Sequence, residues 1–372
     1  MRKQFFWPAV IVSAVSFVVC LGQTPDDATL KINQIQVIGT HNSYHAGIAP
    51  SEAKLWQAKY ADAYKGLDYQ HQPLAQQFDS GVRQIELDIY ADTKGGLYAH
   101  PSGPANVAAA GLPADPPFDP EGIMNKPGFK VMHVQDVDYR STCQPFTACL
   151  QQVRAWSKAH PHHVPIFILV ETKQGKPRSG LHMTEPEPFT SAVFDALDAE
   201  IRSVFPLEEI ITPDDVRGRY ETLNEAVLAR NWPTLASARG KVIFLMDQKS
   251  VGPVYLEGHP SLRGRLIFTN SEPGSPDAAF IERNDGTAEE ITKLVGEGYL
   301  IRTRTDADTK EARANDTSKR DAMIASGAQI LSTDYPVNEP ARWEGHFVVK
   351  FPDNQEARCN PVNSGPRCAE AH

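Results

Sequence analysis

Short apolar segments with the spacing of β-strands recur along most of the chain. In residues 82–90 the apolar Ile85 and Leu87 alternate with the acidic Glu86 and Asp88, and this period of two predicts a strand with two different faces. Similar runs predict seven further strands, at residues 35–39, 129–134, 165–170, 241–246, 265–269, 299–302 and 329–332.

Apolar residues at helical spacing lie between most of these strands. They predict helices at residues 51–64, 73–78, 146–156, 189–205, 220–228, 288–294 and 310–325. Strands that alternate with helices are typical of parallel sheets. We therefore predict an α/β fold, a (β/α)8 TIM-like barrel, regular or distorted, in a single domain over residues 31–342. An open doubly wound sheet is the competing fold, but its nucleotide-binding versions need a Gly-rich turn that this chain lacks.

The amino terminus has the pattern of a secretory signal peptide. Arg2 and Lys3 precede an apolar run, and small residues follow near position 22. The run is too short and too weakly flanked for a membrane span. We predict a signal peptide at residues 1–22 and a secreted or periplasmic protein. A lipid anchor on Cys20 and an uncleaved amino-terminal anchor are the alternatives.

The insertion at residues 102–127 is rich in Pro, Gly and Ala and has no clear period. A loop of that length in a compact domain is usually functional or mobile. Its apolar residues Val107, Leu112 and Phe118 predict either an apolar rim for a bilayer or a lid over a small substrate.

Four cysteines remain after the leader, in two local pairs. In an exported protein this arrangement favours disulfides, between Cys143 and Cys149 and between Cys359 and Cys368. The second pair would hold residues 343–372 as an ordered tail.

The charge of the chain excludes some partners. Its 372 residues carry a formal net charge of −9, and no run of Lys and Arg suggests nucleic-acid binding. Non-specific attraction to an anionic membrane is also disfavoured, so any transient contact with a membrane surface would be local and apolar. No obligate protein partner is evident.

Polar side chains collect where the predicted strands end. In a barrel these ends meet at one mouth. The residues concerned are His41 and Asn42, Glu86 and Asp88, His133, Glu171 and Lys173, Asp247 and Lys249, and Arg302 or Arg304.

One subset of these residues has the chemistry of a calcium site. Asn42, Glu86, Asp88 and Glu171 offer only oxygen and carry three negative charges, which suits Ca²⁺ or, less well, Mg²⁺. Zn²⁺ prefers nitrogen or sulfur ligands.

The remaining polar residues suit the cleavage of a phosphodiester. His41 and His133 would flank the metal and transfer protons, and a carboxylate such as Glu86 can also accept the proton of a nucleophile. Lys173, Lys249 and Arg304 would bind the anionic substrate. A cation would neutralise a phosphoryl oxygen and lower the pKa of an attacking hydroxyl.

Five motifs occur in an order that resembles a known family. They are Gly-Thr-His-Asn-Ser-Tyr, Ile-Glu-Leu-Asp, Lys-Val-Met-His, Leu-Val-Glu-Thr-Lys and Ser-Thr-Asp-Tyr-Pro. Together they resemble the strand-end motifs of phosphatidylinositol-specific phospholipase C, and most closely those of its bacterial, calcium-dependent secreted group. The resemblance covers residues 35–336.

This resemblance implies a distorted barrel and a specific reaction. It implies that Asn42, Glu86, Asp88 and Glu171 bind Ca²⁺, and that the two catalytic histidines are His41 and His133. In that reaction the inositol 2-hydroxyl attacks phosphorus, diacylglycerol leaves, and a cyclic inositol phosphate forms that can then be hydrolysed.

The second histidine has an alternative. His100 lies twelve residues after Asp88, a spacing that resembles glycerophosphodiester phosphodiesterases. If His100 is catalytic, His133 becomes a substrate contact. We favour His133, because it ends a better strand, and we assign His100 to substrate binding. His45, His162 and His163 are predicted to lie on the surface or at helix ends.

Two other functions stay open. One is a phosphodiesterase that acts on soluble glycerophosphodiesters or on another lipid headgroup. The other is a non-catalytic binding protein built on the same barrel. The full set of acidic, histidine and amide residues argues against the second.

Overall fold

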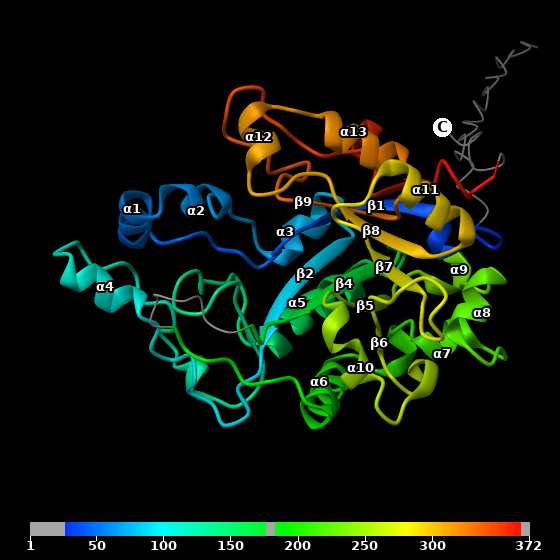
Figure 1. The fold of residues 1–372 in the computed structure, drawn as a ribbon, viewed down its shortest axis with the longest axis horizontal. Helices are drawn as coiled ribbons and strands as arrows, with labels where there is room; N and C mark the ends of the chain where they lie inside the picture. The colour runs from blue at the N-terminus through cyan, green and yellow to red at the C-terminus, as the bar shows by residue number, and fades with distance from the viewer. Residues whose placement is uncertain (1–26, 176–182, 366–372) are drawn as a thin grey trace, which may run out of the picture.

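Eight parallel strands form the centre of the molecule (Figure 1). The computed structural model describes residues 27–175 and 183–365. The eight strands are β1 (Ile35–Thr40), β2 (Gln84–Tyr90), β4 (Ile166–Thr172), β5 (Val242–Met246), β6 (Ile267–Phe268), β7 (Phe280–Glu282), β8 (Leu300–Arg304) and β9 (Ile330–Thr333). They neighbour one another in the order β6-β5-β4-β2-β1-β9-β8-β7.

The two ends of this sheet almost meet. An isolated parallel bridge joins Asn270, just after β6, to Phe280 at the start of β7. On the other side of the ring, Gly39 and Gln84 are the one registered pair between β1 and β2 among the described residues. The α/β barrel predicted from the sequence is therefore confirmed, in its distorted form.

One predicted barrel strand is wrong. Residues 129–134 form only the two-residue β3 (Lys130–Val131), which pairs antiparallel with β2 and lies outside the ring. The apolar Phe129 packs instead against Phe146 and Phe189. The eighth barrel strand is β7, which the sequence did not reveal because three residues are too short to show a period of two.

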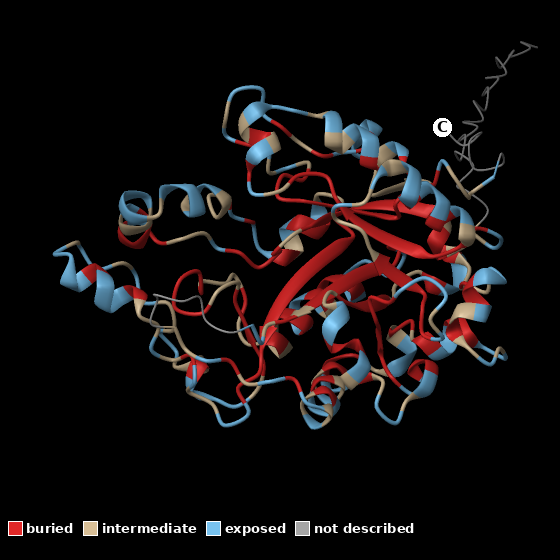
Figure 2. Ribbon diagram, viewed as in Figure 1, coloured by how far each residue is buried: buried red, intermediate tan, exposed pale blue. Residues whose placement is uncertain are grey.

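Helices surround the barrel, and Figure 2 shows buried strands inside mostly exposed helices. They are α1 (Pro50–Lys59), α2 (Ala61–Gly66), α3 (Leu74–Asp79), α4 (Gly103–Ala109), α5 (Phe146–Ala159), α6 (Ser191–Val204), α7 (Pro213–Arg217), α8 (Leu223–Leu228), α9 (Leu235–Ala238), α10 (Gly252–Tyr255), α11 (Ala288–Glu297), α12 (Lys310–Ala314) and α13 (Ser318–Ala325).

Two predicted helices are each divided in the structure. The helix predicted at 51–64 becomes α1 and α2, because Tyr60 between them has non-helical dihedral angles. The helix predicted at 310–325 becomes α12 and α13, and Asn315 ends the first of them in a left-handed conformation that asparagine tolerates well. The insertion, which showed no period, contains the short helix α4.

The carboxyl-terminal segment completes the sheet beside β1. Its strand β10 (Ala357–Cys359) pairs antiparallel with the first half of β1, and Arg83 forms an ion pair with Glu356. The predicted disulfide between Cys143 and Cys149 is confirmed.

Some predictions concern residues that the structure does not describe. The leader at residues 1–22 and Cys368 both lie outside the described residues. Within the described ranges, the helices are too short or too polar to cross a lipid bilayer.

Gly39 lies at the close approach of β1 and β2. A Cβ atom on Gly39 would lie 1.9 Å from Gln84 Oε1 and 2.7 Å from Gln84 Cβ. The Gln84 side chain is completely buried, so it has no free space to move into. The junction of the two strands that carry His41 and Glu86 therefore depends on a residue without a side chain.

We expect Gly39→Ala to lower the free energy of unfolding by about 1–3 kcal/mol, the usual cost of an overpacked site. Denaturant unfolding measures this. Gly296→Ala is the matched control, because Gly296 is exposed in α11 and its Cβ would meet no atom within 4 Å. There alanine should be neutral or stabilising by up to about 1 kcal/mol. Wild-type stability for Gly39→Ala would contradict the close approach.

Candidate active site

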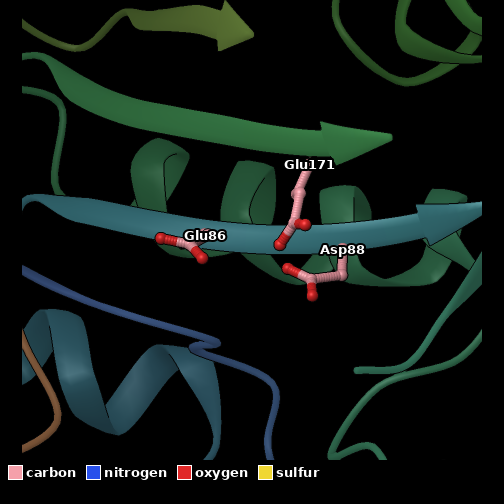
Figure 3. Close-up of side chains that lie close together, drawn as sticks. All are labelled: Glu86, Asp88 and Glu171. Atoms are coloured by element: carbon pink, nitrogen blue, oxygen red, sulfur yellow. The ribbon is translucent and has the colours of Figure 1, made fainter. Parts of the chain in front are cut away.

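Three carboxylates meet inside the mouth of the barrel (Figure 3). Glu86 and Asp88 are two residues apart on β2, so both side chains lie on the same face of the strand. Asp88 pairs in register with Glu171 on the neighbouring β4. One oxygen from each carboxylate lies within 4.8 Å of one from each of the others. The structure thus brings together three of the four predicted metal ligands.

Two cations offset this negative charge. Lys173 Nζ lies 3.0 Å from Asp88 Oδ2 and 3.0 Å from Glu171 Oε1. On the other side, Arg302 Nη2 lies 2.5 Å from Glu86 Oε2. Arg302 is itself almost completely buried and also donates to Glu282 through Nη1. The site therefore depends on side chains from four strands or strand ends.

The environment shifts the pKa values of the three acids apart. Burial raises the pKa of Glu86 to about 7, against the attraction of Arg302. Burial and the neighbouring Glu171 raise the pKa of Asp88 well above its usual value. Burial acts to raise the pKa of Glu171, but the Lys173 ammonium, the contact with Asp88 and the charge of His133 together lower it to about 2.

The residues present fit a hard divalent cation. Both oxygens of Asp88 are buried, and neither accepts a hydrogen bond of good geometry. Asp88 Oδ2 still has the ion pair with Lys173, but Asp88 Oδ1 has no hydrogen-bond partner. A buried carboxylate oxygen normally has one, so Oδ1 points to a missing positive charge. Three clustered carboxylates suit Ca²⁺ better than Zn²⁺, which prefers nitrogen or sulfur ligands.

Asn42 is the second residue after β1 and is completely buried. Its φ of 46° is a left-handed conformation, which asparagine adopts more readily than most residues. Its amide nitrogen donates to the Tyr69 hydroxyl at 2.8 Å, and its amide oxygen faces the Tyr44 hydroxyl at 3.5 Å. This amide oxygen is the uncharged metal ligand that we predicted from the sequence.

His41 is held between two carboxylates. Its Nδ1 lies 2.8 Å from Asp334 Oδ1, and its Nε2 lies 3.6 Å from Glu86 Oε1. Asp334 is held in turn by Arg304 at 3.1 Å. Burial and the charges of Arg304 and Arg302 lower the pKa of His41 well below its usual value. When His41 is neutral and its Nδ1–H donates a hydrogen bond to Asp334, Nε2 is free to accept a proton.

His133 forms the second histidine–aspartate pair. Its Nδ1 lies 2.9 Å from Asp138 Oδ2, and burial lowers its pKa. Asp138 is held near His133 by a tight turn in which the backbone of Val134 and Asp138 forms two hydrogen bonds. The position of His133 is therefore set by its own loop rather than by a barrel strand.

His45 shares Asp138 with His133. Its predicted position on the surface or at a helix end is wrong. It is completely buried, and its Nε2 lies 2.8 Å from both oxygens of Asp138. Burial opposes protonation, but Asp138 raises the pKa of His45 above its usual value. His163 is also buried, and its ring is hydrogen-bonded to the Ser157 hydroxyl. His162 is exposed, as predicted.

The two histidine pairs face a common cavity of about 710 Å³. Its lining includes His41, His133, Tyr69, Arg304 and Asp334. A cavity with two imidazoles, a buried guanidinium and an adjacent acidic cluster has the groups needed to bind a phosphodiester and to move protons on either side of it.

Two predicted substrate contacts lie elsewhere. Lys249 forms a surface ion pair with Glu272, and its side chain is 41% exposed. His100 is exposed in the loop before α4. Neither lines the cavity, whereas Arg304 does and Lys173 reaches the acidic cluster.

Several site residues were missed from the sequence. Asp334 follows β9 directly, as His41 follows β1. Its position at the end of a predicted strand could have marked it as a site residue. Asp138 lies five residues after His133, in the segment His-Val-Gln-Asp-Val-Asp-Tyr-Arg-Ser-Thr-Cys, which also resembles the bacterial calcium-dependent group but to which we assigned no role from the sequence. Tyr69 lies in the loop between α2 and α3, and nothing in the local pattern marks it.

The barrel has counterparts among solved structures. Calcium-dependent phosphoinositol-specific phospholipase C from Pseudomonas sp. is 16% identical, with a TM-score of 0.53 over 90% of this chain and 97% of that one. The Ca²⁺-dependent phosphatidylinositol-specific phospholipase C from Streptomyces antibioticus is 20% identical, with a TM-score of 0.48 over 82% and 95%. At these identities the Pseudomonas structure supports the fold alone.

Sequence comparison identifies the family. No curated protein matches the chain as a whole sequence. Residues 30–361, however, match the family described as "Phosphoinositide phospholipase C, Ca2+-dependent". This match includes both histidine–aspartate pairs and the acidic cluster. The chain belongs to the family of Ca²⁺-dependent phosphoinositide phospholipases C.

Proposed function

We propose that this enzyme cleaves the bond between glycerol and phosphate in phosphatidylinositol and releases diacylglycerol and a cyclic inositol phosphate. The main support is the pair of histidine–aspartate couples that face one cavity beside the acidic cluster. A reaction with an attacking hydroxyl and a leaving alkoxide needs a proton acceptor and a proton donor on opposite sides of phosphorus.

Glu86, Asp88 and Glu171, with the amide oxygen of Asn42, would hold Ca²⁺ in this proposal. When bound, Ca²⁺ would neutralise charge on the phosphate and lower the pKa of the inositol 2-hydroxyl. The buried Asp88 Oδ1, which accepts no hydrogen bond, supports this ligand set.

His41 is the proposed proton acceptor. Its lowered pKa keeps the imidazole neutral before the reaction, with Nε2 available for the proton of the 2-hydroxyl. Asp334 on Nδ1 then stabilises the imidazolium that forms. Glu86, 3.6 Å from Nε2, adds a second negative charge that favours the protonated ring.

His133 is the proposed proton donor to the leaving glycerol oxygen. Asp138 holds its Nδ1, so Nε2 is the atom that would carry the transferred proton. The charge of a bound phosphodiester would raise the lowered pKa of His133 and so favour its acid form. Arg304 and Lys173 are the proposed contacts to the phosphate and the inositol.

We also propose that the enzyme acts outside the cytoplasm. The charged residues and apolar run at positions 1–22 support a secreted or periplasmic location. The disulfide between Cys143 and Cys149 fits an oxidising compartment.

Removal of calcium tests the proposed reaction. We expect phosphatidylinositol vesicles to yield cyclic inositol phosphate with Ca²⁺ present, and we expect a chelator to lower the rate at least about a hundredfold, because one electrostatic stabiliser of the transition state is commonly worth that much. Phosphorus NMR distinguishes the cyclic product. Full activity in chelator would contradict the metal assignment. Cleavage of soluble glycerophosphodiesters without any release from phosphatidylinositol would favour the alternative substrate class.

Substitution of the two candidate histidines tests which one is the donor. His133→Ala should lower kcat by about 10²–10⁴-fold, the usual contribution of a general acid. His100→Ala is the matched control and should stay close to wild type, because His100 is exposed and does not line the cavity. The opposite ranking of the two variants would assign the donor role to His100.

A further inference from the structure

A groove runs between the two helices that project farthest from the barrel. Figure 1 shows α1 and α4 at the left edge of the molecule, away from the strands, and the two helices pack against each other. The groove between them has a volume of about 630 Å³ and is lined mainly by apolar surface. This volume is within the range of small-molecule sites. Leu55 and Trp56 line it from α1, and Ala109 lines it from α4.

The groove adjoins the reaction cavity. Trp56 and Val137 line both spaces. Val137 belongs to the same tight turn as His133 and Asp138, so the groove opens on the His133 side of the cavity. The combined space therefore changes from charged, around His41 and His133, to apolar between the helices.

The two walls of the groove are fixed relative to each other. The Asp115 carboxylate accepts hydrogen bonds from the backbone N–H groups of Ser51 and Glu52, at the start of α1. At the start of α4, a Cβ on Gly103 would lie 2.7 Å from the Tyr139 hydroxyl, so the helix packs tightly there. The insertion thus holds α4 beside α1, and the groove needs no rearrangement to form.

The insertion is not the exposed apolar rim that its sequence suggested. Val107 is buried at 2% exposure, and Phe118 packs on Tyr139 with a ring separation of 5.0 Å. Their apolar surface is directed into the protein. The groove, by contrast, offers apolar surface that a ligand can contact.

The acidic groups that line the groove already have partners. Glu52 accepts a hydrogen bond from the Tyr139 hydroxyl. Asp136 accepts from the backbone N–H groups of Ser102 and Thr184. Lys59 also lines the groove, but it is exposed, and its ammonium lies over the Tyr60 ring at 5.2 Å from the ring centroid. Because the carboxylates are satisfied and most of the lining is apolar, the groove favours a hydrocarbon chain.

We propose that the groove between α1 and α4 binds a fatty acyl chain of the substrate while the headgroup occupies the reaction cavity. This inference rests on the proposed function and makes an intact lipid a better substrate than a soluble glycerophosphodiester. It also places the diacylglycerol leaving group next to His133, the proposed proton donor.

The test uses phosphatidylinositols with chains of four to eight carbons, kept below their micelle concentrations. Each methylene group that moves from water into the groove should raise kcat/KM about fourfold. Ala109→Trp fills the groove from an exposed position on α4, so it should abolish this dependence on chain length. Ala108→Trp, also exposed on α4 but outside the lining, should keep it. Both variants should cleave soluble glycerophosphoinositol at the wild-type rate.

A binding measurement separates this inference from the proposed reaction. The same lipids built on 2-deoxyinositol lack the attacking hydroxyl, and calorimetry gives their Kd. A chain-length dependence of Kd that Ala109→Trp removes supports the groove even if the native lipids are not cleaved. If the native lipids are not cleaved, that result counts against the proposed reaction and not against the groove.

Two results would overturn the inference. One is a chain-length dependence that Ala109→Trp leaves intact. The other is a wild-type enzyme that ignores chain length in monomeric lipid and gains activity only on micelles, which would indicate contact with a lipid surface. Circular dichroism checks that the variant folds. If Ala109→Trp does not fold, Ala58→Trp, on the α1 wall of the groove, replaces it in the test.

Discussion

Two carboxylates on one face of a buried strand, Glu86 and Asp88, impose the central constraint on this structure. Charge inside a barrel is costly unless it is paired. Arg302 pairs with Glu86, and Lys173 reaches Asp88 from the end of β4. The pairing is incomplete, because Lys173 contacts Asp88 through Oδ2 whereas the buried Oδ1 accepts no hydrogen bond. A site with excess buried negative charge and only oxygen donors is organised to receive a cation.

The proton-transfer groups are arranged around this acidic cluster. His41 spans from the cluster to Asp334, whereas His133 lies on a separate loop and relies on Asp138. The two histidines thus approach a common cavity from different supports, which suits opposite roles on the two sides of phosphorus. The apolar groove continues from the His133 side. The metal site, the proton-transfer groups and the apolar groove would then lie in the same order as the headgroup, the phosphate and the acyl chains of a phospholipid.

The sequence predicted much of this arrangement, and the failures have physical reasons. The alternation in β2 identified Glu86 and Asp88, because a period of two is a local property. The third carboxylate, Glu171, was found because it follows a clear apolar strand. Asp138 and His45, by contrast, are 93 residues apart, so their pairing depends on the completed fold. The barrel strand β7 is too short for any pattern to show, and the apolar run at 129–134 was taken in its place.

Calcium binding, measured by titration calorimetry, tests the proposed metal site without any need for substrate. We expect one Ca²⁺ site per chain, and we expect Asp88→Asn to weaken the affinity by roughly tenfold or more, since the variant loses a charged ligand. A circular dichroism spectrum like that of the wild type would show that the variant still folds. Absence of binding at millimolar Ca²⁺, or the same affinity in wild type and Asp88→Asn, would contradict the account.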